Sequence, residues 1–320
     1  MIEVVALGEL LIDFAAQSRD AEGYPTLAAH AGGAPANFLA ALCRFGHPGA
    51  LIGKVGTDAF GALLSETLRK AGIETRGIVR DPSVFTTLAF VTFDAAGDRS
   101  FSFARKPGAD TCLRFEEVEL SLIDAAKVFH FGTLSLTDEP VRSATKAAVA
   151  YAKAKEKLIT CDPNLRLGLW RSPEEARQQL LWALAQADIV KISDEEVEFL
   201  WGLSPEAGAE KLLREFGVHL ALVTLGAEGC YLKNSRAAAA VPGPAVHPVD
   251  TTGAGDIFGG SALSMILEIG KAPEQLGAEE LHQIGAFASM SASLSTEYPG
   301  GIASIRDRET VLRALRACGQ

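Results

Sequence analysis

Short apolar runs rich in β-branched residues alternate with helix-like stretches along most of this 320-residue chain. The strand-like runs lie at residues 4–7, 50–55, 128–132, 158–162, 189–193 and 220–225. Helical patterns separate them, for example at residues 37–45, 60–71 and 141–155. Strands that alternate with helices favour a mostly parallel sheet with helices on both faces. The sequence therefore predicts an α/β fold whose ligands bind at the carboxyl ends of the strands.

Two segments, residues 10–33 and 81–110, interrupt this alternation. In the second, residues 86–93 and 99–105 flank the turn-like sequence DAAGD at residues 94–98. Two β-rich runs around such a turn predict a β-hairpin. The pattern leaves open whether this hairpin is an edge of the main sheet or part of a separate β structure.

The composition narrows the classes of ligand and of compartment. The 48% of hydrophobic residues can bury a sizeable core in one large or two modest domains. With 40 acidic and 30 basic residues the net charge is -10, which argues against nucleic acid as a partner. The five cysteines are scattered without C-x-x-C spacing, so we expect neither a disulfide framework nor a zinc site.

No apolar run reaches the roughly 18 residues that a membrane-spanning helix needs, and no basic signal region opens the sequence. Together with the cysteines, this predicts a soluble, unprocessed cytoplasmic protein with no membrane partner.

Residues 249–256 read VDTTGAGD and lead directly into a helix-like apolar run at residues 257–269. A glycine-rich turn at a helix start presents unpaired backbone N–H groups that attract anions such as phosphate. A carboxylate in that position would repel an anion unless it has a chemical role. We therefore interpret Asp256 as a general base that accepts a proton from an attacking hydroxyl. The alternative is that Asp256 caps the helix.

Two other nucleotide motifs fail in detail. Residues 49–55 read GALIGKV, which is one residue short of a P-loop and has valine where Ser or Thr should bind magnesium, so a strand and turn fit better. Residues 253–258 begin like a dinucleotide fingerprint, but bulky Phe258 replaces its last glycine. A nicotinamide-dependent dehydrogenase is thereby disfavoured.

The string at residues 250–256, completed by Phe258, Gly259 and Gly260, closely resembles the C-terminal signature of the ribokinase-like (PfkB) carbohydrate kinases. Residues 31–37, AGGAPAN, resemble the first signature of the same family, and the resemblance covers nearly the whole chain. It implies a single kinase domain over residues 1–320, with a mostly parallel sheet flanked by helices. It also implies a small β lid formed by about residues 10–33 and 81–110, ATP as phosphoryl donor, and Mg²⁺ as cofactor.

The resemblance implies a set of residues that bind the sugar: Asp13, Gly32, Gly33, Asn37, Arg105, Asn164 and Arg166. Asn164 and Arg166 also follow a predicted strand, where ligand contacts are favoured. Purely structural roles remain open, because paired glycines can simply turn the chain, Asn37 can cap a helix and Arg166 can form a surface ion pair. Ala104 departs from the aromatic residue that similar fructokinases carry before the arginine.

On the nucleotide side, the resemblance implies that ATP is bound by Lys191, Ser193, Thr224, Gly226, Gly229 and Ser289. Glu196 would organise Mg²⁺ through water, and Asp250 and Thr252 are candidate K⁺ ligands. Acidic residues at a helix start are also favoured by the helix dipole alone, so Glu196 has a structural alternative. The glycines at 226 and 229 fit a hairpin turn equally well.

The expected reaction is phosphoryl transfer from ATP to a sugar hydroxyl, with Asp256 as base and the backbone of Gly253, Ala254 and Gly255 stabilising negative charge. Fructose is the first choice of acceptor, because the sequence strings look most like those of fructokinases. Kinases of 2-keto-3-deoxygluconate or aminoimidazole riboside carry similar strings. A catalytically silent sugar-binding protein on this fold is the alternative of another class. The lid of similar kinases often pairs, which suggests a homodimer.

Overall fold

The computed structural model describes residues 2–93 and 99–318, and its described strands form a main sheet of nine strands and a small sheet of four. The main sheet has the order β13-β12-β11-β10-β9-β8-β1-β4-β5. From β11 to β5 all neighbours are parallel, whereas β12 and β13 pair antiparallel at one edge. Its strands are β1 (Val4–Leu7), β4 (Gly49–Gly56), β5 (Ile78–Asp81), β8 (Val128–Gly132), β9 (Leu158–Asp162), β10 (Ile189–Ser193), β11 (Leu220–Thr224), β12 (Gly229–Asn234) and β13 (Ala238–Pro242). The predicted parallel α/β sheet is confirmed.

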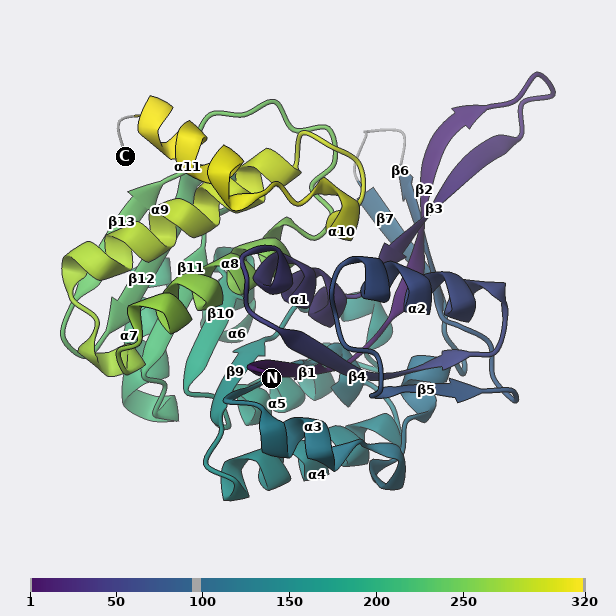
Figure 1. Ribbon diagram of the computed structural model, residues 1–320, viewed down its shortest axis with the longest axis horizontal. Coiled ribbons are helices and arrows are strands. Elements are labelled where there is room, and N and C mark those ends of the chain that lie inside the picture. Colours follow the sequence, from purple (N-terminus) through teal and green to yellow (C-terminus); the bar gives the residue numbers. More distant parts are fainter. Residues whose placement is uncertain (1, 94–98, 319–320) are drawn as a thin grey trace.

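Helices cover both faces of the main sheet (Figure 1). One face packs against α1 (Ala34–Arg44), α2 (Ala59–Lys70), α8 (Ala254–Ile269), α9 (Ala278–Ser295) and α11 (Arg308–Ala317). The other packs against α3 (Leu120–Ala125), α4 (Val141–Ala154), α5 (Pro173–Leu184), α6 (Asp194–Trp201) and α7 (Pro205–Phe216). Alternate residues of the central strands enter the two cores, as in β1, where Val4 contributes to the first and Val5 to the second.

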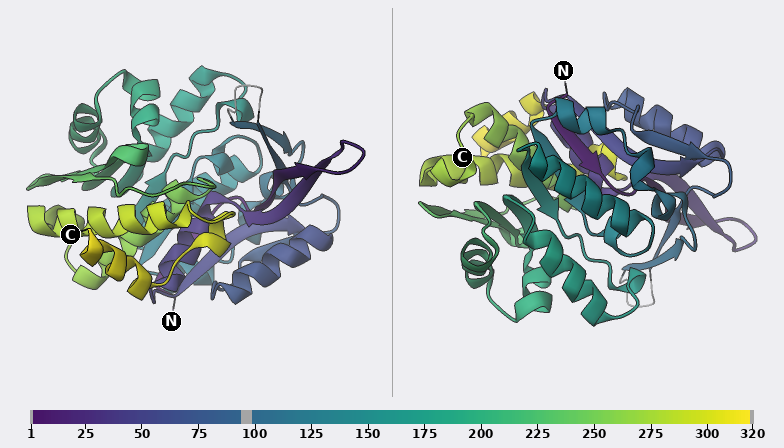
Figure 2. Two further views of the ribbon diagram at one scale, coloured as in Figure 1. Left: turned by 90° about the horizontal axis from the view of Figure 1, so that it is seen from above. Right: turned by 90° about the horizontal axis from the view of Figure 1, so that it is seen from below.

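The small sheet has the order β3-β2-β6-β7 and projects from one end of the main sheet (Figures 1 and 2). Its strands are β2 (Leu11–Arg19), β3 (Pro25–Gly32), β6 (Leu88–Phe93) and β7 (Arg99–Ala104). The predicted hairpin is present as β6 and β7, and its predicted turn at residues 94–98 lies outside the described residues. Because β6 pairs with β2, the alternative that places this hairpin at an edge of the main sheet is wrong.

Two helices begin three residues earlier than their apolar patterns indicate. Helix α1 begins at Ala34 and α8 at Ala254, each directly after a glycine with a positive φ, 114° at Gly33 and 78° at Gly253. Neither N-cap glycine has a side chain to cap the helix, and neither Asn37 nor Asp256 occupies the cap position. The capping alternatives for Asn37 and Asp256 are therefore wrong, and both side chains lie in the first turn of a helix.

The segment at residues 49–55 lies within strand β4, as predicted, and the five cysteines are free. Within residues 2–93 and 99–318, no helix combines the length and the apolar character that a bilayer-spanning segment requires.

Close packing between α1 and α8 generates a prediction about stability. A Cβ atom on Gly260 would lie 2.2 Å from the Phe38 carbonyl oxygen of α1. Helix propensity alone would make Gly260→Ala stabilising by about 1 kcal/mol. We expect instead a loss of roughly 1–3 kcal/mol in the free energy of unfolding, because α8 must move away from α1. Urea denaturation measures this difference.

Gly168→Ala is the matched control, since nothing lies within 4 Å of a Cβ atom built at that position. Equal unfolding free energies for the two variants would contradict the packing argument.

Candidate active site

The carboxyl ends of several parallel strands meet the N-terminal ends of α1 and α8, and buried polar side chains gather there. Asp256 lies in the first turn of α8 and is 9% exposed. A Cβ atom on Gly253 would lie 2.8 Å from Asn37 Nδ2, so glycine is required there for both its backbone angle and its size. The glycine-rich turn thus brings the start of α8 against the start of α1.

Two asparagines donate hydrogen bonds to Asp256, one to each carboxylate oxygen. Asn37 Nδ2 donates to Oδ2 at 2.9 Å, and Asn164 Nδ2 lies 3.4 Å from Oδ1. Asn164 follows β9 and has a φ of 46°, in the left-handed region where asparagine is tolerated. The structure therefore brings together three residues that the sequence assigned to the base and to the sugar.

Burial is the main reason that the pKa of Asp256 rises from 3.8 to about 7. The nearby charge of Asp162 raises the pKa further, whereas the Asn37 hydrogen bond and the charges of Lys191 and Arg166 lower it. A carboxyl group with a pKa near neutrality can accept and release a proton under ordinary conditions. This property fits the predicted role of a general base.

An ion pair beneath Asp256 joins β9 and β10. Lys191 Nζ lies 3.1 Å from Asp162 Oδ2, and both side chains are almost fully buried. Burial favours the neutral form of Lys191, but Asp162, Glu196 and Asp256 outweigh it and raise the lysine pKa. A Cβ atom on Gly255 would lie 2.9 Å from Lys191 Nζ, so the ammonium group lies against the start of α8.

Sequence reasoning missed Asp162, although it is the first residue of the Asp-Pro-Asn-x-Arg string whose asparagine and arginine were selected. Its position as the last residue of a buried strand was the available signal. An acidic residue at the carboxyl end of a parallel strand lies where ligands are expected. Asp162 should therefore be included in the candidate site.

The small sheet contributes Asp13, which lies on β2 opposite His30 of the neighbouring strand β3. The pKa of Asp13 is raised to about 6, mainly because the side chain is buried. The charge of Arg166 opposes this rise, and the charge of Asp250 adds to it. Arg166 also acts on Asp256, so its charge lies near a carboxylate of β2 and a carboxylate of α8. A Cβ atom on Gly32 would lie 2.0 Å from Asp13 Oδ2, which explains why glycine occupies this position. Asp13, Gly32 and Arg166 therefore gather at one site, as predicted.

Gly33 lies between the end of β3 and the start of α1. A Cβ atom on Gly33 would lie 2.4 Å from the Glu9 carbonyl oxygen. Its positive φ and this close approach give Gly33 a clear backbone role at the start of α1. A contact between Gly33 and a sugar stays a prediction.

Most of the predicted nucleotide residues lie at the adjacent ends of β10 and β11. Ser193 and Thr224 are partners in register. Thr224 is followed by η5 (Gly226–Glu228), and the φ angles of Gly226 and Gly229 are 56° and 110°. The turn and the strand ends therefore form one edge, on which a ligand could contact backbone groups closely.

Glu196 is buried and forms a capping box with Ser193 at the start of α6. Its Oε1 accepts from the Leu165 N–H at 2.6 Å and its Oε2 from the Ser193 N–H at 2.9 Å. Burial raises its pKa, while Lys191 lowers it and Asp162 raises it. With one backbone donor on each oxygen, Glu196 retains lone pairs that fit a water-mediated contact to a metal better than a full inner-sphere role.

Asp250 stabilises the loop before α8 by accepting two backbone hydrogen bonds. Its Oδ1 accepts from the Thr252 N–H at 3.0 Å and its Oδ2 from the Gly300 N–H at 2.9 Å. The Ala254 N–H donates to the Thr251 carbonyl at 3.3 Å, so this donor already has a protein partner. The K⁺ ligand roles of Asp250 and Thr252 stay predictions.

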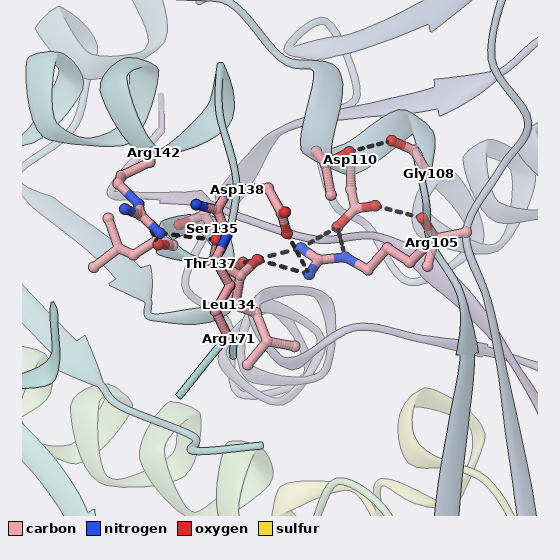
Figure 3. Close-up of polar contacts among 12 residues, drawn as sticks. Arg105, Gly108, Asp110, Leu134, Ser135, Thr137, Asp138, Arg142 and Arg171 are labelled. Atoms are coloured by element: carbon pink, nitrogen blue, oxygen red, sulfur yellow. Dashed lines mark hydrogen bonds and ion pairs between the residues drawn. The ribbon is translucent and has the colours of Figure 1, made fainter. Parts of the chain in front are cut away.

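Two predicted ligand residues, Ser289 and Arg105, have protein partners in this structure. Ser289 of α9 is buried, and its hydroxyl lies 3.4 Å from Cys230 Sγ of β12. Arg105 is 5% exposed, and its guanidinium group is bonded to Asp110, Thr137 and the Leu134 carbonyl (Figure 3). The predicted roles of Ser289 toward ATP and of Arg105 toward the sugar stay predictions.

The chain matches the model of the pfkB family of carbohydrate kinases over residues 1–308. It is 43% identical to Fructokinase-1 of Zea mays over 317 residues, covering 98% of this chain and 97% of that protein. Fructokinase of Xylella fastidiosa with bound ATP superposes with a TM-score of 0.88 at 30% identity, covering all of both chains. Fructokinase of Vibrio cholerae O395, in a form bound to fructose, ADP and calcium ion, superposes with a TM-score of 0.87 at 31% identity. The match covers 98% of this chain and 99% of that one.

These similarities extend over almost the entire chain, and the buried carboxylate, the asparagines and the glycine turn lie together where the two signatures meet. The chain belongs to the pfkB family of carbohydrate kinases.

Proposed function

We propose that this protein is an ATP-dependent fructokinase that transfers the γ-phosphoryl group of ATP to fructose and forms fructose 6-phosphate. The observation that carries the proposal is the buried Asp256 carboxyl in the first turn of α8, with a pKa of about 7 and two asparagine donors. Relatives named fructokinase over nearly the full length support the choice of sugar. Kinases of 2-keto-3-deoxygluconate and aminoimidazole riboside are the alternatives.

In this mechanism the Asp256 carboxylate accepts the proton of the attacking hydroxyl. Asn37 and Asn164 hold both carboxylate oxygens, which orients the base before the sugar binds. The start of α8, with Gly253, Ala254 and Gly255, places the positive end of the helix dipole toward the transferring phosphoryl group. Lys191 adds a positive charge beside Gly255.

Sugar recognition would combine residues of the small sheet with residues at the start of α1 and in the loop after β9. We propose that Asp13, Gly32, Gly33, Asn37, Asn164 and Arg166 surround the sugar. The small sheet would act as a lid that excludes water, because water competes with the sugar as the phosphoryl acceptor.

ATP would bind along the ends of β10 and β11, near Ser193, Thr224, Gly226 and Gly229. Bound Mg²⁺ would neutralise charge on the ATP phosphates. Glu196 would hold it through water, because its two oxygens already accept backbone hydrogen bonds. A contribution of Ser289 to the adenine pocket, and K⁺ near Asp250 and Thr252, belong to the same proposal.

A panel of sugars tests the function. With ATP and Mg²⁺, we expect coupled ADP release to be fastest with fructose, and Asp256→Asn to lower kcat about 10²- to 10⁴-fold, since the amide cannot accept the proton. Asp20→Asn, in the exposed turn between β2 and β3, is the control and should retain full activity.

Turnover restricted to 2-keto-3-deoxygluconate or aminoimidazole riboside would transfer the proposal to that acceptor. Sugar binding without turnover by the wild-type protein would identify a silent binding protein instead.

The pH dependence of kcat/KM tests the environment of Asp256. Because the base must be ionised, activity should rise with pH and reach half its maximum near pH 7. Asp162→Asn removes a charge that raises the Asp256 pKa and should move the midpoint to lower pH. Lys191→Met removes a charge that lowers this pKa and should move it to higher pH.

These two substitutions control for each other, because both remove half of one ion pair. Shifts in the same direction would show that the midpoint reports another group.

A homodimer formed through the small sheet is a further part of the proposal, together with the cytoplasmic location. The tip of the β2–β3 hairpin exposes Tyr24 at 69% and Leu27 at 38%, which is apolar area that a partner could cover. Light scattering should give twice the monomer mass for the wild-type protein, and the double variant Tyr24→Ser, Leu27→Ser should give the monomer mass. A wild-type monomer at all concentrations would refute the dimer.

A further inference from the structure

Along the described residues, the chain passes between the main sheet and the small sheet four times. The crossings are at residues 8–10 between β1 and β2, and at residue 33 between β3 and α1. The other two are at residues 82–87, between β5 and β6, and 105–108, after β7. Any movement of the small sheet over the site must take place at these segments.

Buried side chains link the crossings in pairs. At the first, Glu9 Oε1 accepts a hydrogen bond from the Ala34 N–H at 2.8 Å, directly after the second crossing. At the third, the Thr87 hydroxyl donates to Asp110 Oδ1. At the fourth, Arg105 Nε donates to Asp110 Oδ2 at 2.8 Å (Figure 3). One carboxylate of η1 (Ala109–Cys112) therefore holds both the third and the fourth crossing.

The two pairs are also linked to each other. The Ile12 N–H, at the start of β2, donates to the Thr87 carbonyl at 3.1 Å. Burial raises the pKa of Glu9 to about 7, and the charge of Arg105 is among the effects that oppose this rise. All four crossings therefore belong to one network.

Arg105 also connects this network to the main sheet. Its Nη1 donates to Thr137 Oγ1 at 2.8 Å and its Nη2 to the Leu134 carbonyl at 2.9 Å, both at η3 (Leu134–Leu136) after β8. Each of its three guanidinium nitrogens thus has a protein acceptor, and the side chain is 3% exposed. A buried cation with these bonds is held in one position.

The backbone around the network leaves little room for adjustment. A Cβ atom on Gly108 would lie 1.8 Å from Thr87 Oγ1 and 3.1 Å from Arg105 Cγ. The third and fourth crossings therefore pack directly against each other. A change in one must move the other.

We propose that Arg105 is a positioning residue, which sets the place of the small sheet over Asp256 by holding Asp110, Thr137 and Leu134, and that it does not bind the sugar. Asp13 lies on β2, close to the first crossing, so a displaced network would displace a group that the proposed function assigns to the sugar. Misplacement by about 1 Å can lower a rate about 100-fold. The inference rests on the proposed function only for its effect on the rate.

The test compares Arg105→Met, Arg105→Lys and Thr87→Val with wild type. Thr87→Val keeps the volume but removes the hydroxyl that donates to Asp110. Arg142→Met is the matched control, because Arg142 donates to the Leu136 and Thr137 carbonyls and to Glu175 but to no residue of the crossings. If Arg105→Met does not fold, Arg105→Lys and Thr87→Val carry the test.

The first measurement is amide hydrogen exchange without any ligand, so that its result does not depend on the acceptor sugar. We expect exchange in β2 and β6 to become roughly ten- to hundredfold faster in the Arg105 variants, less so in Thr87→Val, and unchanged in Arg142→Met. Exchange in β8 to β11 should stay at the wild-type rate in all of them.

The second measurement is turnover with the preferred sugar. The Arg105 variants should lower kcat by about 10- to 100-fold and raise the ratio of ADP to sugar phosphate, because a displaced lid admits water. Unchanged exchange in the small sheet, or equal acceleration in Arg142→Met, would overturn the proposal. A raised KM for the sugar with unchanged exchange and kcat would return Arg105 to the role of a sugar ligand.

Discussion

The site depends on one costly arrangement, a carboxyl group buried at the start of a helix. Burial opposes the charged form of Asp256, and the nearby Asp162 adds to this cost. The Asn37 hydrogen bond and the charges of Lys191 and Arg166 compensate only in part, so the pKa remains well above 3.8. Since the folded-state pKa is raised, ionisation of this group lowers the stability of the fold as the pH increases from about 4 to about 7. The protein therefore retains a destabilising group at the position where a base is needed.

The parallel sheet makes this arrangement possible. Asn164 follows β9, Lys191 lies on β10 and Asp256 lies on α8, yet adjacent strand ends bring all three together. Two backbone segments at the site have unusual conformations, since φ is 78° at Gly253 before α8 and 46° at Asn164 after β9. The chemistry thus rests on backbone conformations as much as on the side chains themselves.

Sequence patterns predicted the elements well because the apolar runs of buried parallel strands are strong signals. The strings that resemble the family signatures also selected Asp256, Asn37 and Asn164, whose side chains the structure brings into contact. Their roles in binding and catalysis stay predictions. The starts of α1 and α8 were placed three residues late, because Gly33 and Gly253 begin these helices through their φ angles and carry no apolar side chain.

The sequence did not reveal which side chains would bond to each other when they lie far apart along the chain. Thr137 lies 32 residues from Arg105, and no local pattern reveals that its hydroxyl accepts from this guanidinium group. The end of a buried strand marked Asp162 as a candidate, but its pairing with Lys191 appears only when β9 and β10 are placed side by side. The type of a residue can suggest that it binds a ligand. Only the three-dimensional structure shows which of its hydrogen-bond donors already have a protein partner.

The four crossings also limit how this chain can be recombined with its relatives. The small sheet looks like a module that could be exchanged between two kinases, because its strands fall in two segments of the chain. Its anchor, however, lies outside those strands, on Asp110 of η1 and on the loop after β8. A chimera that exchanged only the strands would join foreign strands to the native Thr87 and Arg105, which lie in the crossings just outside β6 and β7. The natural unit of exchange therefore includes η1 and η3 along with the strands.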